Sequence, residues 1–331
     1  MSAQRRQLSD GRWHFQHGPI DIVIGADGRD DAVRTAHEAA WQRFRGVLEE
    51  LVAELPRLRE PIRPGDCPPQ GPIARRMWTA CAPYHRSCFI TPMAAVAGAV
   101  AQELVAYYER DGIDRAWINN GGDIALHLAP GHALRIGIYA DIARLDAREV
   151  LHGIRSDGCF EVAHPMAVRG VATSGWRGRS FSLGVADSVT VLAATAAQAD
   201  AAATIVANAV DVDDPRIVRR PACELKDDTD LGAIPVTVDV PRLDPATVQR
   251  ALDAGLRRAH ELQREGLVDS CALVCQGLVA VAGPIAGPAG PIAGPADPSA
   301  GLADPADLVI GPPAALRVVE RRLEVHGAAL S

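Results

Sequence analysis

The stretch from Gly170 to Val210 constrains the fold most, because it predicts two short strands separated by a polar turn and then a small-residue helix. The second strand is expected over residues 187–192. An alanine-rich helix follows it, and Thr195 is predicted to be its N-cap, because a hydroxyl there can accept a hydrogen bond from the first free amides. A helix with so little side-chain bulk can lie very close to a sheet or a ligand.

The rest of the chain supplies alternating strand patterns and wide apolar helical stripes. We expect a single α+β domain, or a tightly joined pair, with helices 30–55 and 92–109 packed on one antiparallel sheet. Pro56 is predicted to end the first helix, and Gly98 in the second suggests close approach of another backbone or a merely tolerated glycine. Further strands are expected at 13–24, 117–118, 124–128, 133–139, 160–162, 236–240 and 268–281, and further helices at 73–82, near 147 and at 244–266.

Residues 282–313 form an Ala/Gly/Pro-rich tract that offers almost no side chain to bury. We therefore divide the chain into a main domain at 1–281, this low-complexity excursion, and an edge strand with a tail at 314–331. Replacing residues 284–306 by a short linker is expected to change the melting temperature little. A large loss of folded protein would show that the tract packs against the domain.

Composition and charge exclude several classes of protein. The formal net charge of −7 argues against a general nucleic-acid surface. The N-terminus has no apolar signal core, and Gly-Pro pairs break the longest uncharged run, so we expect no membrane segment. The seven cysteines form no Cys-x-x-Cys pair, which indicates a cytoplasmic protein with reduced thiols. Homo-oligomer formation remains open.

Two polar turns and one helix face carry the residues that suggest a ligand site. The first turn is Asn120-Gly121-Gly122-Asp123, and the second joins the hydroxyls of Thr173 and Ser174 to Gly175, with Arg177 and Arg179 on either side of Gly178. Asp200 and Thr204 stand four apart on the alanine-rich helix and therefore share a face. Together these features suit a small anionic ligand in the loop, with a hard cation such as Mg²⁺ between ligand and helix.

A plainer interpretation of the same residues is a hairpin and a packing helix in which Asp200 caps a neighbouring element. If Asp200 is not a cap, its carboxylate is expected to pair with Arg177 or Arg179, or to face a cation. Cys88 is the thiol to test for reactivity, although a buried structural cysteine is the favoured interpretation.

Four ordered segments then resemble a known family: PMAAVAGAVAQ at 92–102, NNGGDI at 119–124, the run at 173–189, and ADAAATIVAN at 199–208. In this order they are similar to the ApbE superfamily, in particular to its short ApbE-like branch, to which no activity is assigned. The resemblance covers residues 10–281. It implies a T-fold-related antiparallel sheet with packed helices. The superfamily includes flavin transferases that use FAD and Mg²⁺ to attach FMN to a protein threonine, and its names also link it to thiamine biosynthesis.

The resemblance implies that Asp200 and Thr204 hold Mg²⁺ and that FAD or a related nucleotide is the ligand. It also associates the branch with sulfur or cofactor metabolism. The chain departs from the transferases, because it lacks their His-Ile-Ile-Asp-Pro-x-Thr-Gly run after Ser174. It also has Arg179 where the branch has His, and Ala172 where the branch has a hydroxyl.

Three functions follow from this comparison of motifs. The first is an enzyme on an ApbE-like fold that is no longer a flavin transferase; the second is retained FAD:protein FMN transfer; the third is a non-enzymatic nucleotide-binding module. No catalytic residue is assigned.

Overall fold

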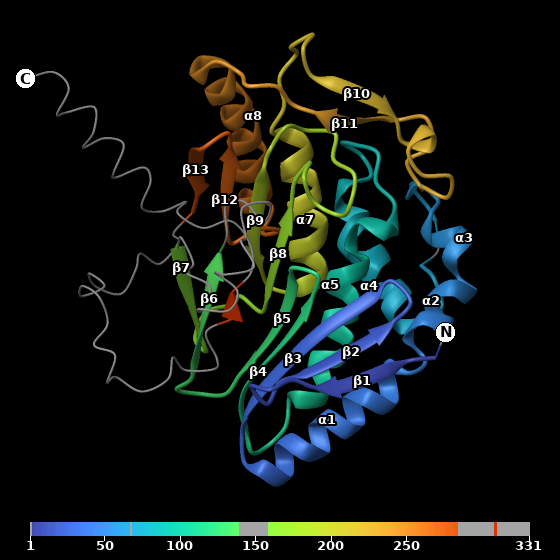
Figure 1. Ribbon diagram of the computed structural model, residues 1–331, viewed down its shortest axis with the longest axis vertical. Helices are drawn as coiled ribbons and strands as arrows, with labels where there is room; N and C mark the ends of the chain where they lie inside the picture. Colours follow the sequence, from blue (N-terminus) through green and yellow to red (C-terminus); the bar gives the residue numbers. More distant parts are fainter. Residues whose placement is uncertain (1, 67, 139–157, 284–307, 310–331) are drawn as a thin grey trace, which may run out of the picture.

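A nine-stranded antiparallel sheet forms the centre of the protein, with the strand order β1-β2-β3-β4-β5-β8-β9-β12-β13 (Figure 1). The computed structural model describes residues 2–66, 68–138, 158–283 and 308–309. The strands of this sheet are β1 (Gln4–Gln7), β2 (Trp13–His17), β3 (Ile20–Gly28), β4 (Ile113–Asn120), β5 (Asp123–Leu128), β8 (Gly170–Ser174), β9 (Ser188–Ala193), β12 (Ser270–Cys275) and β13 (Leu278–Ala282).

Two smaller sheets flank the central one. The first pairs β10 (Val218–Pro221) with β11 (Pro235–Asp239), and the second contains β14 (Leu308–Val309), β6 (Ala133–Ile138) and β7 (Gly158–Ala163). The strands predicted from alternation are therefore present, and the expected α+β architecture with one antiparallel sheet is confirmed.

Both faces of the central sheet are buried, and β5 shows how alternation divides them. Ile124 and Leu126 belong to a core shared with Leu134 and Val162 of the β6–β7 sheet. Ala125, which points to the opposite face, belongs to the larger core beneath the helices. Successive side chains of a strand point to opposite faces, so one strand contributes to both cores.

The helices lie on one face of the central sheet, behind it in Figure 1. Among them, α1 contacts β3, α5 contacts β4 and β5, α7 contacts β8 and β9, and α8 contacts β12 and β13. The helices are α1 (Asp30–Phe44), α2 (Val47–Ala53), α3 (Leu55–Leu58), α4 (Pro72–Cys81), α5 (Val96–Val105), α7 (Ala196–Ala209) and α8 (Pro245–Arg264), with 3₁₀ turns η1 (Ala82–Tyr84), η2 (Pro92–Ala95), η3 (Ala106–Tyr108) and η5 (Ala222–Glu224).

The prediction of one helix over residues 30–55 is wrong, because this stretch contains α1, α2 and the start of α3. Gly46, with φ −103° and ψ 0°, is the N-cap of α2. Glu54 leaves helical geometry before α3 begins. Pro56 was expected to end a helix but lies in the first turn of α3, where a missing N–H is tolerated.

The predicted helix at 92–109 is likewise divided into η2, α5 and η3. Ala95, with φ −129° and ψ 16°, separates the first two. Thr91 caps η2 by accepting a hydrogen bond from the Met93 N–H. The break gives α5 its own N-terminus, and this terminus lies at the candidate site described below.

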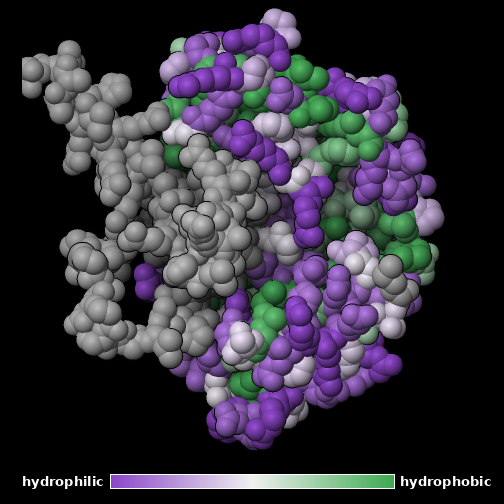
Figure 2. All heavy atoms as spheres, viewed as in Figure 1, coloured by the Kyte–Doolittle hydropathy of each residue, from purple (hydrophilic) through white to green (hydrophobic). Residues whose placement is uncertain are grey.

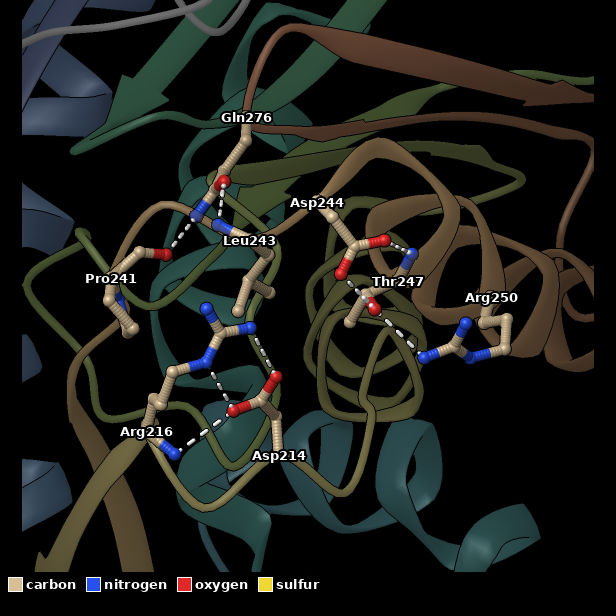
Figure 3. A network of polar contacts seen from close by, with 8 residues as sticks. All are labelled: Asp214, Arg216, Pro241, Leu243, Asp244, Thr247, Arg250 and Gln276. Carbon is tan, nitrogen blue, oxygen red and sulfur yellow. Dashed lines mark hydrogen bonds and ion pairs between the residues drawn. The ribbon is translucent and has the colours of Figure 1, made fainter.

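The predicted N-terminal caps of α7 and α8 are confirmed. Thr195 accepts a hydrogen bond from the Gln198 N–H at the start of α7. Asp244 accepts from the Thr247 N–H at 3.0 Å and from the Thr247 hydroxyl at 2.6 Å (Figure 3). Gln276 of the β12–β13 turn bonds to Leu243 and Pro241 just before α8, which joins this turn to the start of the helix.

Several sequence predictions lie wholly or mostly outside the described residues: the helix near 147, the 282–313 tract and the edge strand at 315–325. Cys271 and Cys275 are buried, as predicted, and burial raises the pKa of each thiol to about 12. On the face drawn in Figure 2, hydrophobic residues form scattered patches among hydrophilic ones. Within the described ranges no helix combines the length and the apolar character needed to cross a bilayer.

Candidate functional site

The turn between β4 and β5 is a two-residue hairpin turn closed by Asn120 and Asp123. Gly121 and Gly122 both have positive φ, at 68° and 115°, as the sequence predicted for this turn. The Asn119 side chain accepts a hydrogen bond from the Gly122 N–H at 2.9 Å, and the Asn120 amide donates to the Ala97 carbonyl at 3.1 Å. The turn is therefore fixed both internally and against α5.

Asp123, the first residue of β5, faces the end of β8. Its Oδ1 accepts a hydrogen bond from the Thr173 N–H at 3.3 Å. Burial of the carboxyl raises the pKa of Asp123 to about 7, while this hydrogen bond and the charge of Arg179 act in the opposite direction. At neutral pH the group therefore takes up a proton or a cation far more readily than an ordinary aspartate does.

Asp200, in the first half of α7, caps the N-terminus of α5. Its Oδ2 accepts a hydrogen bond from the Gly98 N–H at 2.9 Å. A Cβ on Gly98 would lie 2.2 Å from the Ala196 carbonyl oxygen, so the absence of a side chain lets the two helices approach this closely. Both the capping role considered for Asp200 and the close approach predicted at Gly98 are thus present in the structure.

The two carboxylates are close enough to oppose each other's ionisation. Burial raises the pKa of Asp200 well above its usual range, and the charge of Asp123 raises it further. Each carboxylate uses one oxygen for a main-chain N–H. The Ala97 N–H also acts on Asp200 and, like that of Gly98, lowers the pKa of its carboxyl against the effect of burial. Two neighbouring desolvated carboxylates are suited to sharing a proton or a cation.

Thr204 lies one turn further along α7, partly exposed, and no hydrogen bond of its hydroxyl occurs among the described residues. No group of three or more His, Cys, Asp or Glu side chains that could hold a metal occurs in the part of the chain that the structure describes. Among the described residues, the side chains that could contact a cation here are the two carboxylates and the Thr204 hydroxyl. Such a site fits Mg²⁺, which keeps several waters and commonly binds one or two carboxylates together with phosphate oxygens.

The two arginines of the 175–187 loop have different surroundings. A Cβ on Gly121 would lie 1.8 Å from Nη2 of Arg179, so this guanidinium rests directly on the glycine turn. Arg177 instead forms an ion pair with Asp187 (Nε–Oδ1 3.4 Å) and lies over the Trp176 ring. Asp187 also accepts a hydrogen bond from the Gln276 N–H. Arg179 is therefore the cation beside Asp123, whereas Arg177 helps to anchor the loop.

The remaining predicted ligand residues lie at the end of β8. Thr173 has its hydroxyl 3.1 Å from that of Thr190 on β9, and Ser174 is the last residue of the strand. Gly175 follows, and a Cβ there would lie 2.5 Å from the Asp187 carbonyl oxygen, so this glycine is required by close packing. The structure therefore brings Thr173 and Arg179 to Asp123. A role for these residues in ligand binding remains a prediction.

Sequence reasoning missed the main-chain contribution to the site. The Gly98 N–H holds Asp200, and the Asn119 side chain holds the glycine turn. Asn120 was predicted as a ligand residue, and its amide donates to the Ala97 carbonyl. Gly98 within an apolar helix did indicate a close approach of another backbone, but nothing in the sequence shows that its partner is Asp200. The interpretation of Cys88 as buried is also wrong: the residue is exposed, and partial desolvation raises the pKa of its thiol, which disfavours the reactive thiolate.

The raised carboxyl pKa values predict how stability depends on pH. In metal-free protein the folded state holds protons that the unfolded chain releases near pH 4, so this contribution is greatest at low pH. It is lost as the pH rises through about 7. Relative to the Asp123→Asn variant, the free energy of unfolding of wild-type protein in EDTA should fall by about 1–3 kcal/mol between pH 5 and 8. The reason is that a pKa difference of one unit between the folded and unfolded states corresponds to about 1.4 kcal/mol. Urea unfolding at several pH values measures this difference, and parallel pH profiles would contradict it.

The fold and the site define an α+β protein in which a glycine hairpin and a small-residue helix present paired carboxylates. The chain belongs to the family described as AbpE bacteria, whose model matches residues 5–281. This agrees with the range of the resemblance found in the motifs and includes every site residue described above.

Related proteins from archaea carry the name UPF0280 protein. That of Methanothrix thermoacetophila is 36% identical over 172 residues, which is 51% of this chain and 66% of the relative. That of Methanopyrus kandleri is 34% identical over 212 residues, covering 63% and 78%. That of Methanosphaerula palustris is 39% identical over 201 residues, covering 60% and 77%.

Two crystal structures show more distant similarity. The ApbE protein of Thermotoga maritima has a TM-score of 0.40 and 12% identity, covering 85% of this chain and 96% of its own. The apo form of the flavinyl transferase ApbE of Pseudomonas stutzeri has a TM-score of 0.40 and 13% identity, covering 85% and 94%. Similarity at this level says nothing about the activity of this chain.

Proposed function

We propose that this protein binds a small anionic, nucleotide-like ligand together with a divalent cation between Asp123 and Asp200. The observation that carries the proposal is the proximity of two desolvated carboxylates that main-chain N–H groups hold in place. A divalent cation would relieve their mutual repulsion and would leave coordination positions for ligand oxygens. Thr204 would contribute a hydroxyl from the same helix.

The surroundings of the pair support an anionic ligand. Arg179 lies on the Gly121 turn beside Asp123, and Ser174 and the loop after it supply a hydroxyl and main-chain amides. Glycines in the turn allow a ligand to approach the backbone. In this proposal the cation and Arg179 would neutralise the phosphates, while Asp123 and Asp200 would hold the cation.

Binding without flavin transfer is the function that we favour. Membership of the AbpE family and the resemblance of the motifs to those of the flavin transferases suggest FAD as the first ligand to test. The chain nevertheless lacks the His-Ile-Ile-Asp-Pro run on which flavin transfer depends in the transferases, so we propose an enzyme with a different reaction. Flavin transfer and a purely nucleotide-binding role are the alternatives.

Incubation with FAD, Mg²⁺ and a threonine-containing acceptor protein tests the proposal. We expect saturable FAD binding that EDTA abolishes and no AMP release. AMP release with flavin on the acceptor would establish flavin transfer instead. Tight binding with no turnover of any offered substrate would favour the nucleotide-binding role, and absence of FAD binding would exclude FAD as the ligand. If a panel of nucleotides and Mg²⁺ showed no mutual dependence of binding, the proposal would be wrong.

A further inference from the structure

Part of the edge of β3 that faces away from β4 pairs with no other strand of the described chain. β2 pairs with β3 only from Ile20 to Ile24, whereas β4 pairs with β3 as far as Gly28. Alternate residues of a strand direct both main-chain groups to the same neighbour. Ile20 pairs with His17 across a two-residue turn, so its main-chain N–H and C=O point towards β2. Ala26 lies six residues further on and therefore points the same way, away from β4, where no strand of the described residues continues.

This edge opens into a groove of about 750 Å³ between α1 and the turn that joins β1 to β2. The turn closes on itself through hydrogen bonds from Leu8 N–H to Arg12 O and from Gly11 N–H to Leu8 O. It therefore does not extend β2 along β3. The volume is within the range of about 300–1,000 Å³ that ligand sites occupy. In Figure 1 the region lies where α1 passes below β1, β2 and β3.

Trp117, whose side chain carries a buried hydrogen-bond donor, is one of the residues that line the groove. Trp117 of β4 lies opposite Gly25, and a Cβ on Gly25 would be 2.1 Å from the indole Cζ2, so the ring extends across β3. Trp117 is 2% exposed, and among the described residues its Nε1 has no hydrogen-bond partner. Buried N–H groups are nearly always paired in folded proteins. The Trp117 N–H therefore indicates a hydrogen-bond acceptor that does not belong to the described residues.

The charges of the groove largely cancel. Arg5 pairs with Glu38 at 2.6 Å, and Arg12 pairs with Asp10 at 2.5 Å. Arg115, which lies behind the groove, pairs with Asp27 at 2.6 Å. The other charged side chains of the wall, Asp30 and Arg34, are of opposite sign. A groove without excess charge does not select an anion.

The remaining ionisable group of the wall is also uncharged. His37 lies against Trp13 and is bonded through Nδ1 to the Tyr108 hydroxyl at 2.7 Å. Burial lowers the pKa of His37 to about 4, so the ring is neutral at pH 7. The groove therefore suits an uncharged ligand that offers both hydrogen-bond donors and acceptors.

We propose that the groove binds an extended segment of a partner polypeptide, which adds to the edge of β3 at Ala26 as a further strand. Main-chain pairing would hold the segment, as in other cases of strand addition. Its alternate side chains would face the two sides of the sheet. A Ser, Thr, Asn or Gln on the Trp117 side would accept the indole N–H. This inference is independent of the function proposed for Asp123 and Asp200.

Panning a displayed library of random heptapeptides against the full-length protein tests the proposal. Recovered peptides are synthesised, and their affinity is measured for wild type, Trp117→Phe, Ala26→Pro and the control Trp78→Phe. Trp117→Phe removes the indole N–H together with part of the aromatic ring, and the control Trp78→Phe makes the same deletion at a residue outside the groove. Ala26→Pro removes the edge amide, which pairs with no strand of the described chain. We expect at least tenfold weaker binding for both and unchanged binding for Trp78→Phe. The Ala26 amide should also exchange more slowly with deuterium when peptide is bound.

Each other outcome overturns the proposal. A library that yields no binder, or binders that both variants retain, excludes a peptide in this groove. Loss on Trp117→Phe with wild-type affinity for Ala26→Pro would assign the groove to a small hydrogen-bonding ligand instead. If Ala26→Pro does not fold, exchange of the Ala26 amide in wild type decides: no protection by bound peptide excludes strand addition.

Discussion

Gly98→Ala is expected to destabilise the protein by about 2–3 kcal/mol, although alanine normally favours a helix over glycine by about 1 kcal/mol. The added Cβ would lie 2.2 Å from the Ala196 carbonyl oxygen and 2.9 Å from the Asp200 Cβ. Both belong to α7, so the contact can be relieved only by separating the two helices. The steric effect therefore outweighs helix propensity, and urea denaturation measures the result.

Gly46→Ala is the matched control, because a Cβ at this N-cap meets no atom within 4 Å. Its effect should stay within about 0.5 kcal/mol, as for most surface substitutions. The Gly98 variant should also lose cation-dependent ligand binding, because α7 carries Asp200. Equal stabilities of the Gly98 and Gly46 variants would show that α5 and α7 are not in this close contact.

Asp200→Asn should have opposite effects on stability and on binding. Metal-free protein at pH 8 is expected to gain stability, because the substitution removes the repulsion between two desolvated carboxylates. Asparagine can still cap α5. Mg²⁺-dependent binding of FAD, or of whichever nucleotide binds, should weaken by about 1.5–3 kcal/mol, the scale of a lost charge-assisted contact. Calorimetry and urea unfolding give the two quantities.

Asp211→Asn is the control for this pair of measurements. Asp211 is also a partly buried aspartate whose pKa is raised by burial, but it is paired with Arg219 in the β10 region. Its substitution should leave nucleotide binding unchanged and should not stabilise the protein. A capping role alone for Asp200 would predict unchanged binding in Asp200→Asn.

The sequence predicted elements well where local signals determine them. Alternation located the strands, and the caps Thr195 and Asp244 located the starts of α7 and α8. The breaks at Gly46 and Ala95 were missed, because the apolar stripe continues across each of them and neither is a proline. Such breaks depend on where the next turn must pack, which is tertiary information.

The site could be predicted only in part for the same reason. Asp123 and Asp200 stood out as carboxylates among glycines and alanines, and the structure brings them together. The Gly98 N–H that fixes Asp200 is 102 residues away in the chain. Arg177 and Arg179 were equivalent in the sequence, but Asp187 and the β12–β13 turn hold the first while the second lies on Gly121.

Titration of Mn²⁺ into the protein, followed by electron paramagnetic resonance at pH 7.5 with and without FAD, tests the cation site most directly. The account predicts one bound Mn²⁺ per chain in wild type and in Asp211→Asn, and a loss of at least tenfold in affinity in Asp123→Asn and in Asp200→Asn. Mn²⁺ binding that neither substitution weakens, or no binding by the wild type under either condition, would contradict it.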